Sequence, residues 1–148
     1  MPLQRLVYTS RLASGVVPDT GQATAKALAT TSRRANEARA ITGVLTLIDG
    51  LFVQVLEGPG DAVEDLFEAI CRDLRHCKLN LVDVSPITER LFPSWGMAFL
   101  DGQAPGQTPL RARALEQIAF QVTINATETA RQLRELLDLA EAPLALAA

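Results

Sequence analysis

The segment that decides the fold spans residues 44–56 and reads VLTLIDGLFVQVL. Asp49 and Gly50 separate two apolar runs, and Asp-Gly in this position is typical of a two-residue turn, because both turn residues need a positive φ. The segment therefore predicts a β-hairpin with strands at Val44–Ile48 and Leu51–Leu56. Both faces of the second strand are largely apolar. We expect two helices to cover one face of its sheet, and either C-terminal helices or a second subunit to cover the other.

Other elements are expected on both sides of the hairpin. Residues 3–10 alternate as a strand, and the Ala-rich residues 22–37 favour a helix, because Ala is the best helix former. After the hairpin, Asp61 and Glu64 have the spacing of a capping box. They predict a second helix that begins there and ends near His76.

Two further strands are expected after the second helix. Residues 79–87 and 95–100 have strand-like patterns, and Pro86 favours an edge position for the first of them. The order β-α-β-β-α-β, plus one more strand, predicts an α+β fold, a ferredoxin-like antiparallel sheet with both helices on one face. The expected organisation is a domain at residues 1–100, a linker at 101–110 and a C-terminal extension of two short helices at 111–148.

The composition excludes several classes of protein. The chain has 148 residues, of which 48% are hydrophobic and 21% charged, with a net charge of −3. This is ordinary for one globular domain and lacks the basic excess of a nucleic-acid binder. Two Cys and one His cannot build a structural zinc site, so no metal is expected. No leader pattern or membrane-length apolar run is found, and we expect a cytoplasmic protein that binds neither membrane nor nucleic acid.

Gln54 is a lone polar side chain within an apolar strand. A buried amide without partners costs about 1–3 kcal/mol. Pairing of the first strand with the second hairpin strand would place Tyr8 beside Gln54, and Asn36, at the end of the first helix, near the same edge. Tyr, Gln and Asn offer donors and acceptors without a strong acid or base, which suits a ring with amide-like edges better than hydrolysis. Asn at a helix end is also common as a left-handed cap.

Several short motifs carry a resemblance to a known family. They are LVYTS at 6–10, SRRAN at 32–36, ITGVL at 41–45, FVQVLEG at 52–58, ICRDLRH at 70–76 and FPSWGM at 92–97. In this order and spacing the motifs resemble the BLUF family, the blue-light sensors that use FAD. The resemblance covers about residues 3–100 and implies a flavin-binding sensor domain, with the flavin ring held between the two helices.

The resemblance also implies a role for each matching side chain. Tyr8 is expected to give an electron and then a proton to the excited flavin, while Gln54, between Tyr8 and the flavin N5/O4 edge, rotates or tautomerises. The residues expected to bind FAD are Tyr8, Leu28, Asn36, Gln54, Asp73, Arg75 and His76. Those expected to relay the change to the last strand are Ser10, Trp95 and Met97. The adenosine end of FAD is expected to be loosely held, so that FMN or riboflavin can substitute.

The sequence thus predicts a stand-alone blue-light photoreceptor rather than an enzyme, because the residues after position 100 are too few for a catalytic output domain. Its signal is expected to pass to an unknown downstream protein partner or to a change in self-association, within a homo-oligomer of at least two copies. Two alternatives stay open. One is a small ferredoxin-like hydrolase of phosphate esters or acyl phosphates, in which Asn36 and nearby arginines bind phosphate. The other is a cofactor-free oligomerisation module.

Overall fold

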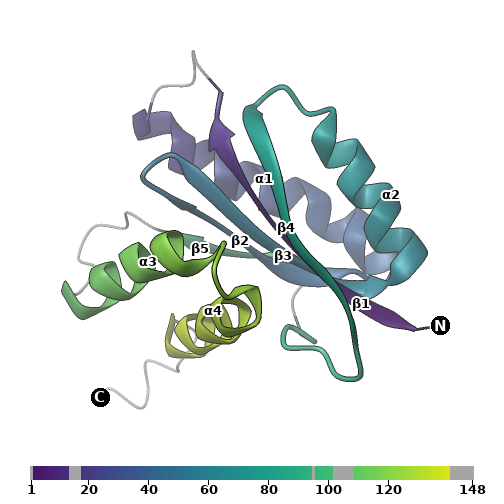
Figure 1. Ribbon diagram of the computed structural model, residues 1–148. Coiled ribbons are helices and arrows are strands. Elements are labelled where there is room, and N and C mark those ends of the chain that lie inside the picture. Colours follow the sequence, from purple (N-terminus) through teal and green to yellow (C-terminus); the bar gives the residue numbers. More distant parts are fainter. Residues whose placement is uncertain (1, 14–17, 95, 102–108, 141–148) are drawn as a thin grey trace, which may run out of the picture.

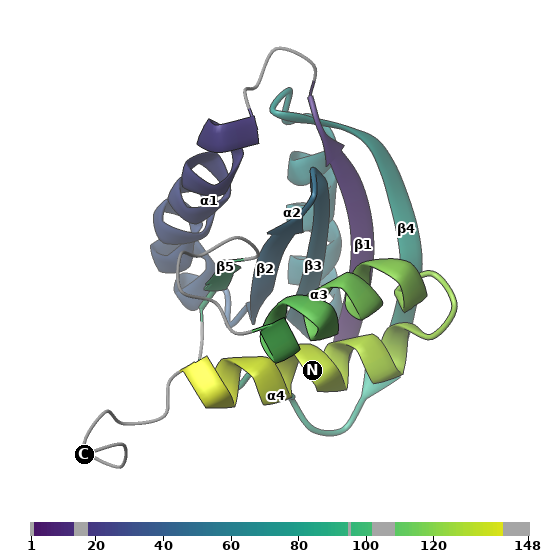
Figure 2. The ribbon, with the colours of Figure 1, turned by 90° about the vertical axis from the view of Figure 1, so that its left-hand side faces the viewer.

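The structure is a computed structural model that describes residues 2–13, 18–94, 96–101 and 109–140. In chain order its elements are β1 (Leu3–Leu12), α1 (Pro18–Ala38), β2 (Thr42–Ile48), β3 (Leu51–Pro59), α2 (Gly60–Cys71), β4 (His76–Ile87), β5 (Ala98–Asp101), α3 (Pro109–Gln121) and α4 (Ala126–Ala140). The strands form one sheet in the order β4-β1-β3-β2-β5. Helices α1 and α2 lie on one face of this sheet, and α3 and α4 lie on the other (Figures 1 and 2).

The hairpin forms as the Asp-Gly pair predicts. Asp49 and Gly50 have φ values of 49° and 79°, so both turn residues adopt the left-handed region. Strand β2 pairs antiparallel with β3, with Ile48 opposite Leu51. Strand β1 pairs antiparallel with the other edge of β3, which makes β3 the middle strand and confirms the predicted pairing.

Strands β4, β1, β3 and β2 pair antiparallel, as predicted for the ferredoxin-like core, and the additional strand makes the sheet mixed. Strand β5 pairs parallel with β2, while β4 is an edge strand, as Pro86 indicated. The reason is topological. Strands β4 and β5 lie at opposite edges, so the chain between Ile87 and Ala98 crosses to the far side of the sheet and enters β5 in the direction of β2.

Each face of the sheet has its own buried cluster, because successive strand residues point to opposite faces. The cluster toward α1 and α2 includes Leu6, Tyr8, Phe52 and Leu56 of the strands. The cluster toward α3 and α4 includes Val7, Val53, Val55, Leu115, Ile118 and Leu133. The C-terminal helices therefore cover the second apolar face that the sequence left open.

The helices begin at other residues than predicted. Helix α1 begins at Pro18 rather than Gln22, since proline is well suited to the first turn of a helix. Helix α2 begins at Gly60, and Pro59 occupies the N-cap without a side-chain cap bond. The capping box predicted at Asp61 and Glu64 is therefore absent from α2.

Helix α2 also ends earlier than predicted, at Cys71 rather than near His76. The Asp73 carboxylate accepts a 2.9 Å hydrogen bond from the Arg75 backbone N–H, a local bond that competes with continued helix. Leu74, which follows Ile70 at helical spacing, lies beyond the end of the helix and is 90% exposed. His76 instead begins β4.

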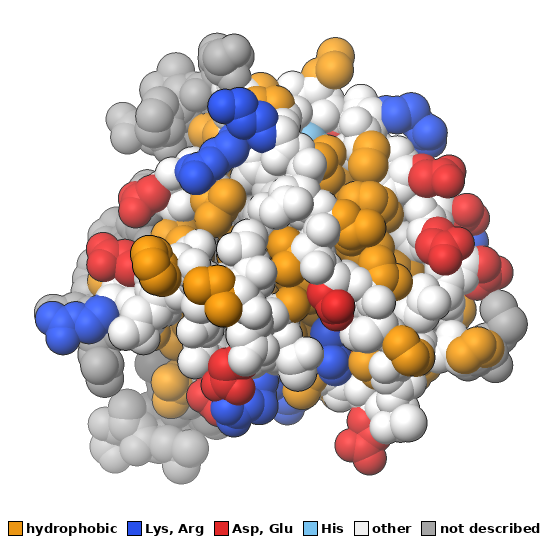
Figure 3. All heavy atoms as spheres, in the orientation of Figure 1, with side chains coloured by type: hydrophobic (Ala, Val, Ile, Leu, Met, Phe, Trp, Pro, Cys, Tyr) orange, Lys and Arg blue, Asp and Glu red, His pale blue; other side chains and the backbone are white. Residues whose placement is uncertain are grey.

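The surface in the orientation of Figure 1 shows hydrophobic side chains gathered near the middle of the molecule, around β4 and α2 (Figure 3). Leu81 and Val84 of β4 are among the exposed large apolar residues. Within the described ranges, no helix combines the length and hydropathy that crossing a membrane requires.

Candidate functional site

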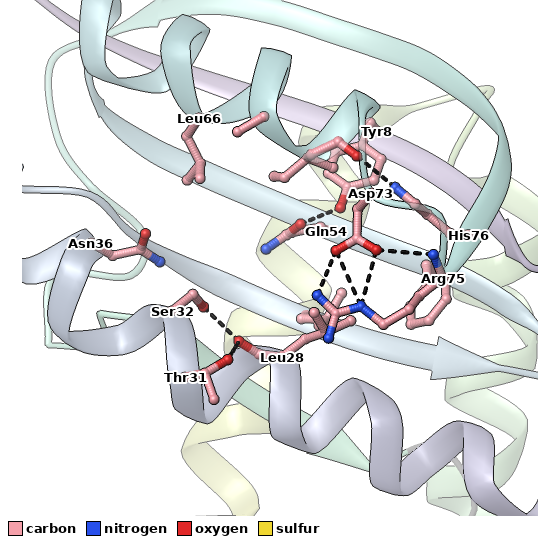
Figure 4. Close-up of a pocket in the computed structure, with 14 residues that line it drawn as sticks. Tyr8, Leu28, Thr31, Ser32, Asn36, Gln54, Leu66, Asp73, Arg75 and His76 are labelled. Carbon is pink, nitrogen blue, oxygen red and sulfur yellow. Dashed lines mark hydrogen bonds and ion pairs between the residues drawn. The ribbon is translucent and has the colours of Figure 1, made fainter.

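A cavity of about 260 Å³ lies between α1, α2 and the face of the sheet that these helices cover (Figure 4). The structure brings to it all seven side chains that the sequence assigned to FAD binding: Tyr8, Leu28, Asn36, Gln54, Asp73, Arg75 and His76. The other lining residues are Thr31, Ser32, Leu45, Phe52, Leu66, Ala69 and Ile70.

Tyr8 and Gln54 are direct partners across the β1–β3 pair, and both are buried. The Tyr8 hydroxyl donates a hydrogen bond to Gln54 Oε1, and Figure 4 shows the two side chains pointing toward one another. Gln54 Nε2 in turn donates to Met97 Sδ at 3.2 Å. The amide therefore has its oxygen toward the phenol and its nitrogen toward the residue that precedes β5.

The Tyr8 hydroxyl is protonated where it meets Gln54. Burial raises the pKa of the Tyr8 hydroxyl far above its ordinary value near 10, and the negative charge of Asp73 raises it further. The phenol therefore keeps its proton at neutral pH and acts as the donor. The Gln54 oxygen accepts this hydrogen bond.

His76 links the end of α2 to β1 at the edge of the cavity. Its Nε2 lies 2.7 Å from the Ile70 carbonyl oxygen, and its Nδ1 lies 2.8 Å from Ser10 Oγ. A carbonyl can only accept, so Nε2 carries a proton, and in the neutral ring Nδ1 accepts from Ser10. The ring also meets Tyr8 edge-on at a centroid distance of 6.3 Å. Ser10, a predicted relay residue, is thus buried behind the cavity wall and bonded to His76.

Asn36 connects α1 to the segment that precedes β5. Its buried Nδ2 donates to the Gly96 carbonyl oxygen at 2.9 Å. The left-handed residue after α1 is Ala40, with φ 58°, so the alternative interpretation of Asn36 as a left-handed cap was wrong. Asn36 and Gln54 therefore bind neighbouring residues, Gly96 and Met97. Trp95, the third predicted relay residue, lies outside the described residues.

Asp73 and Arg75 form an ion pair at the rim of the cavity, with Arg75 Nη2 at 2.6 Å from Asp73 Oδ2. The hydrogen bond from the Arg75 side chain lowers the pKa of Asp73 to about 2. The pair leaves a guanidinium with spare donors beside the cavity, because a guanidinium has five N–H groups. Half of the Arg75 side chain is exposed, which favours reorientation toward a bound ligand.

The chemistry of the lining fits a flavin ring. Leu28, Leu45, Leu66 and Ile70 provide apolar walls for a flat ring system. The amides of Asn36 and Gln54, together with Arg75 and His76, provide donors and acceptors for carbonyl and ring-nitrogen edges. Among the described lining residues Asp73 is the only carboxylate, and it is paired with Arg75.

The sequence reasoning missed the lining residues Thr31, Ser32, Leu45, Phe52, Leu66, Ala69 and Ile70. Helical spacing was the signal that could have found those on α1 and α2. Ser32 lies four residues from both Leu28 and Asn36, so the three share one face of α1.

The comparisons with known proteins agree with this geometry. The family model for sensors of blue light using FAD matches residues 3–98. A photoactivated adenylate cyclase subunit beta from Euglena gracilis is 32% identical over 140 residues, which cover 82% of this chain but only 16% of the relative. The chain therefore matches only about a sixth of the length of that curated relative.

Two solved structures are similar over nearly the whole chain. The dark-state structure of BlrB, a BLUF protein, has a TM-score of 0.72 at 29% identity and covers 94% of this chain and 97% of its own. The photo-activated state of BlsA has a TM-score of 0.73 at 26% identity, covering 91% of this chain and 94% of its own.

The residues matched by the family model include every side chain that lines the cavity and both strands of the Tyr8–Gln54 pair. The match favours a light sensor over the hydrolase and over the cofactor-free module. The cofactor is FAD, and the stimulus is blue light. From its sequence, its fold and its cavity, the chain belongs to the BLUF family.

Proposed function

We propose that Tyr8 and Gln54 form the light-driven switch of this sensor. One observation carries the proposal: the buried Tyr8 hydroxyl donates to Gln54 Oε1, while Gln54 Nε2 donates to Met97 Sδ. Bound FAD supplies the absorption of blue light and a ring that can accept an electron. Tyr8 is the only tyrosine in the chain, and its phenol is neutral, so it can release an electron and then its proton.

The seven side chains predicted from the sequence would hold the flavin ring. Asn36 and Gln54 would bind its carbonyl and nitrogen edges, and Leu28 would pack on its face. Asp73, Arg75 and His76 would border it from the α2 side. Because these residues would all contact the flavin ring, which FMN and riboflavin share with FAD, either compound should be able to bind in place of FAD.

Gln54 is suited to a switch because its amide presents a donor at one end and an acceptor at the other. Rotation or tautomerisation of the amide changes which group faces Tyr8. It also changes what Met97 receives, since Gln54 Nε2 donates to Met97 Sδ before the change. Two arrangements of one buried side chain give the two states that a signal needs.

The output is proposed to leave through the face covered by α3 and α4. Ser10, Trp95 and Met97 would pass the change at Gln54 toward β5, and residues 111–148 would carry it onward from the sensor domain at 1–100 and the linker at 101–110. The domain itself would be a sensor and not an enzyme. The recipient would be a downstream protein or a second copy of this chain, in a homo-oligomer of at least two copies.

The structure of a bacterial light-regulated adenylyl cyclase supports the proposal that a domain of this fold passes its signal to an output unit. Its structure covers 80% of this chain at a TM-score of 0.67 and 30% identity, and this chain covers 34% of the cyclase chain. In that protein light regulates a cyclase. For the present chain the corresponding recipient is proposed to be a separate molecule.

Absorption spectroscopy in the dark and directly after blue light tests the switch. A flavin spectrum that shifts slightly to the red and recovers in darkness is the expected result. A bound flavin that only bleaches, or whose spectrum does not move, would overturn the Tyr8–Gln54 switch.

A further inference from the structure

Glu57 of β3 is a carboxylate with 0% exposure that lies outside the flavin cavity. It lies on the side of the sheet that α3 and α4 cover, opposite Arg5 of β1. Its Oε2 accepts from Arg5 Nε at 2.8 Å and from the Leu91 N–H at 3.0 Å, and its Oε1 accepts from the Phe92 N–H at 2.8 Å. A buried charge is tolerated only where donors surround it in this way.

Leu91 connects this carboxylate to α4. The Leu91 N–H is bound by Glu57, and the Leu91 carbonyl oxygen accepts a hydrogen bond from Arg134 Nη1 of α4. Arg134 is also held by Asp138 of the same helix at 3.0 Å. One residue of the β4–β5 connection thus joins the middle strand of the sheet to the last helix.

The same connection reaches the flavin cavity at its other end. Gly96 accepts from Asn36 and Met97 accepts from Gln54, both residues of the cavity wall. Phe92 belongs to the buried cluster that contains Ala98 of β5 and Leu133 of α4. The connection is therefore bound to the cavity near Met97 and to α4 near Leu91.

We propose that Glu57 is a positioning residue for signal output, which holds Leu91 and Phe92 on β3 so that a change at Gln54 and Met97 moves α4. The inference rests on the proposed Tyr8–Gln54 switch and names the route by which that switch is read. Glu57 fixes the Phe92 end of the connection. A displacement that begins at Met97 is then passed to α4 through Leu91 and Arg134 rather than lost in a loose loop.

The location of Glu57 separates this role from a role in photochemistry. Glu57 does not line the flavin cavity, and it points to the opposite face from Gln54, because the two are three residues apart on one strand. Replacing it should leave the chemistry of Tyr8 and Gln54 unchanged. Glu57 accepts from Arg5 and from two backbone N–H groups at once, so it specifies one arrangement of Leu91 and Phe92 against β3.

The experiment uses the FAD-loaded full chain and two readouts, the light-induced red shift and the light-minus-dark change in hydrogen exchange of the α4 backbone. The variants are Glu57→Gln and Arg134→Gln. Glu57→Gln keeps the size of the side chain. Its amide nitrogen is a donor, so it cannot accept the hydrogen bonds that one carboxylate oxygen of Glu57 accepts. Arg134→Gln removes the donor to Leu91 from a partly exposed side chain, so this variant should fold even if Glu57→Gln does not.

The matched control is Arg131→Gln, which removes exposed ion pairs to Glu128 and Glu135 within α4 without touching Leu91. We expect both test variants to keep the full red shift and lose the exchange response of α4, while the control keeps both. A full α4 response in Arg134→Gln, or in a folded Glu57→Gln, would overturn the inference. So would a wild type that shifts to the red without any α4 response. A wild type without a red shift would overturn the proposed switch itself, which distinguishes the two failures.

Discussion

The Tyr8 hydroxyl donates to the Gln54 side-chain oxygen between two residues that are 46 positions apart in sequence and direct partners in the β1–β3 register. A strand pair fixes the distance between opposite side chains more tightly than a loop could. Burial keeps Tyr8 protonated, and its hydroxyl donates to the Gln54 oxygen.

Replacing Tyr8 with Phe should leave FAD bound and abolish the light-induced red shift. Phe lacks the hydroxyl proton and the easily oxidised phenol, but it fills almost the same space. The measurement is the difference spectrum between dark and illuminated protein. Phe67→Leu is the matched control, because its ring lies 5.5 Å from that of Tyr8 and its loss leaves the hydroxyl in place. A normal red shift in Tyr8→Phe would contradict the switch.

Replacing Asn36 with Ala should lower the free energy of unfolding of the FAD-free chain by about 1–3 kcal/mol, because a buried carbonyl then lacks its donor. The bond that is lost is the one from Asn36 Nδ2 to the Gly96 oxygen. Urea denaturation measures the change. Asn80→Ala, at an exposed position of β4, should change stability by less than about 0.5 kcal/mol. Equal effects in the two variants would show that the Asn36 bond contributes nothing.

The Asp73–Arg75 pair should make stability depend on pH in the acid range. Since the pKa of Asp73 is lowered to about 2, its contribution is present above the ordinary Asp pKa of about 3.9 and is lost as the pH falls toward 2. The pair is partly exposed, so we expect no more than about 1 kcal/mol. The difference in unfolding free energy between wild type and Asp73→Asn should shrink between pH 4 and pH 2. Arg75→Gln should behave in the same way, and a difference that grows in acid would contradict this assignment.

Flavin should stabilise the fold through its ring. Free FAD at about 100 times its dissociation constant should raise the free energy of unfolding by about 2.7 kcal/mol, because it binds only the folded state. Riboflavin should bind within about tenfold of FAD, equivalent to about 1.4 kcal/mol, since the lining residues suit a ring and the sequence holds no glycine-rich dinucleotide motif. Thermal melts with FAD, riboflavin and adenosine monophosphate check this. Stabilisation by the adenosine compound alone would argue against it.

Local chemistry made much of the fold predictable. Asp49 and Gly50 predict a two-residue turn, because few other residue pairs accept two positive φ values. The pairing of the first strand with the hairpin then follows from topology, and with it the meeting of Tyr8 and Gln54. The parallel entry of β5 and the early end of α2 were not predictable in this way, because they depend on where the chain crosses the sheet and on one side chain that competes with the helix.

The parts of the site formed by distinctive side chains could be predicted from the sequence, whereas the contacts made by backbone groups could not. Asn36 and Gln54 stand out by type, but the partner of Asn36 is a backbone carbonyl, which no residue pattern marks. Glu57 is a charge at the end of an apolar strand and could have drawn attention. Its partners Leu91 and Phe92 could not have been recognised in the sequence, because each binds Glu57 through its backbone N–H.

The alternation of side chains along β3 divides the work of this strand by the parity of the residue number. The even positions 52, 54 and 56 face the flavin side, and the odd positions 53, 55 and 57 face the C-terminal helices. In the proposals above, the even positions would contact the flavin and start the signal, while the odd position Glu57 would hold the segment that passes the signal to α4. Inserting or deleting one residue in β3 would turn the side chains beyond that point to the opposite face, so it should impair both flavin binding and output.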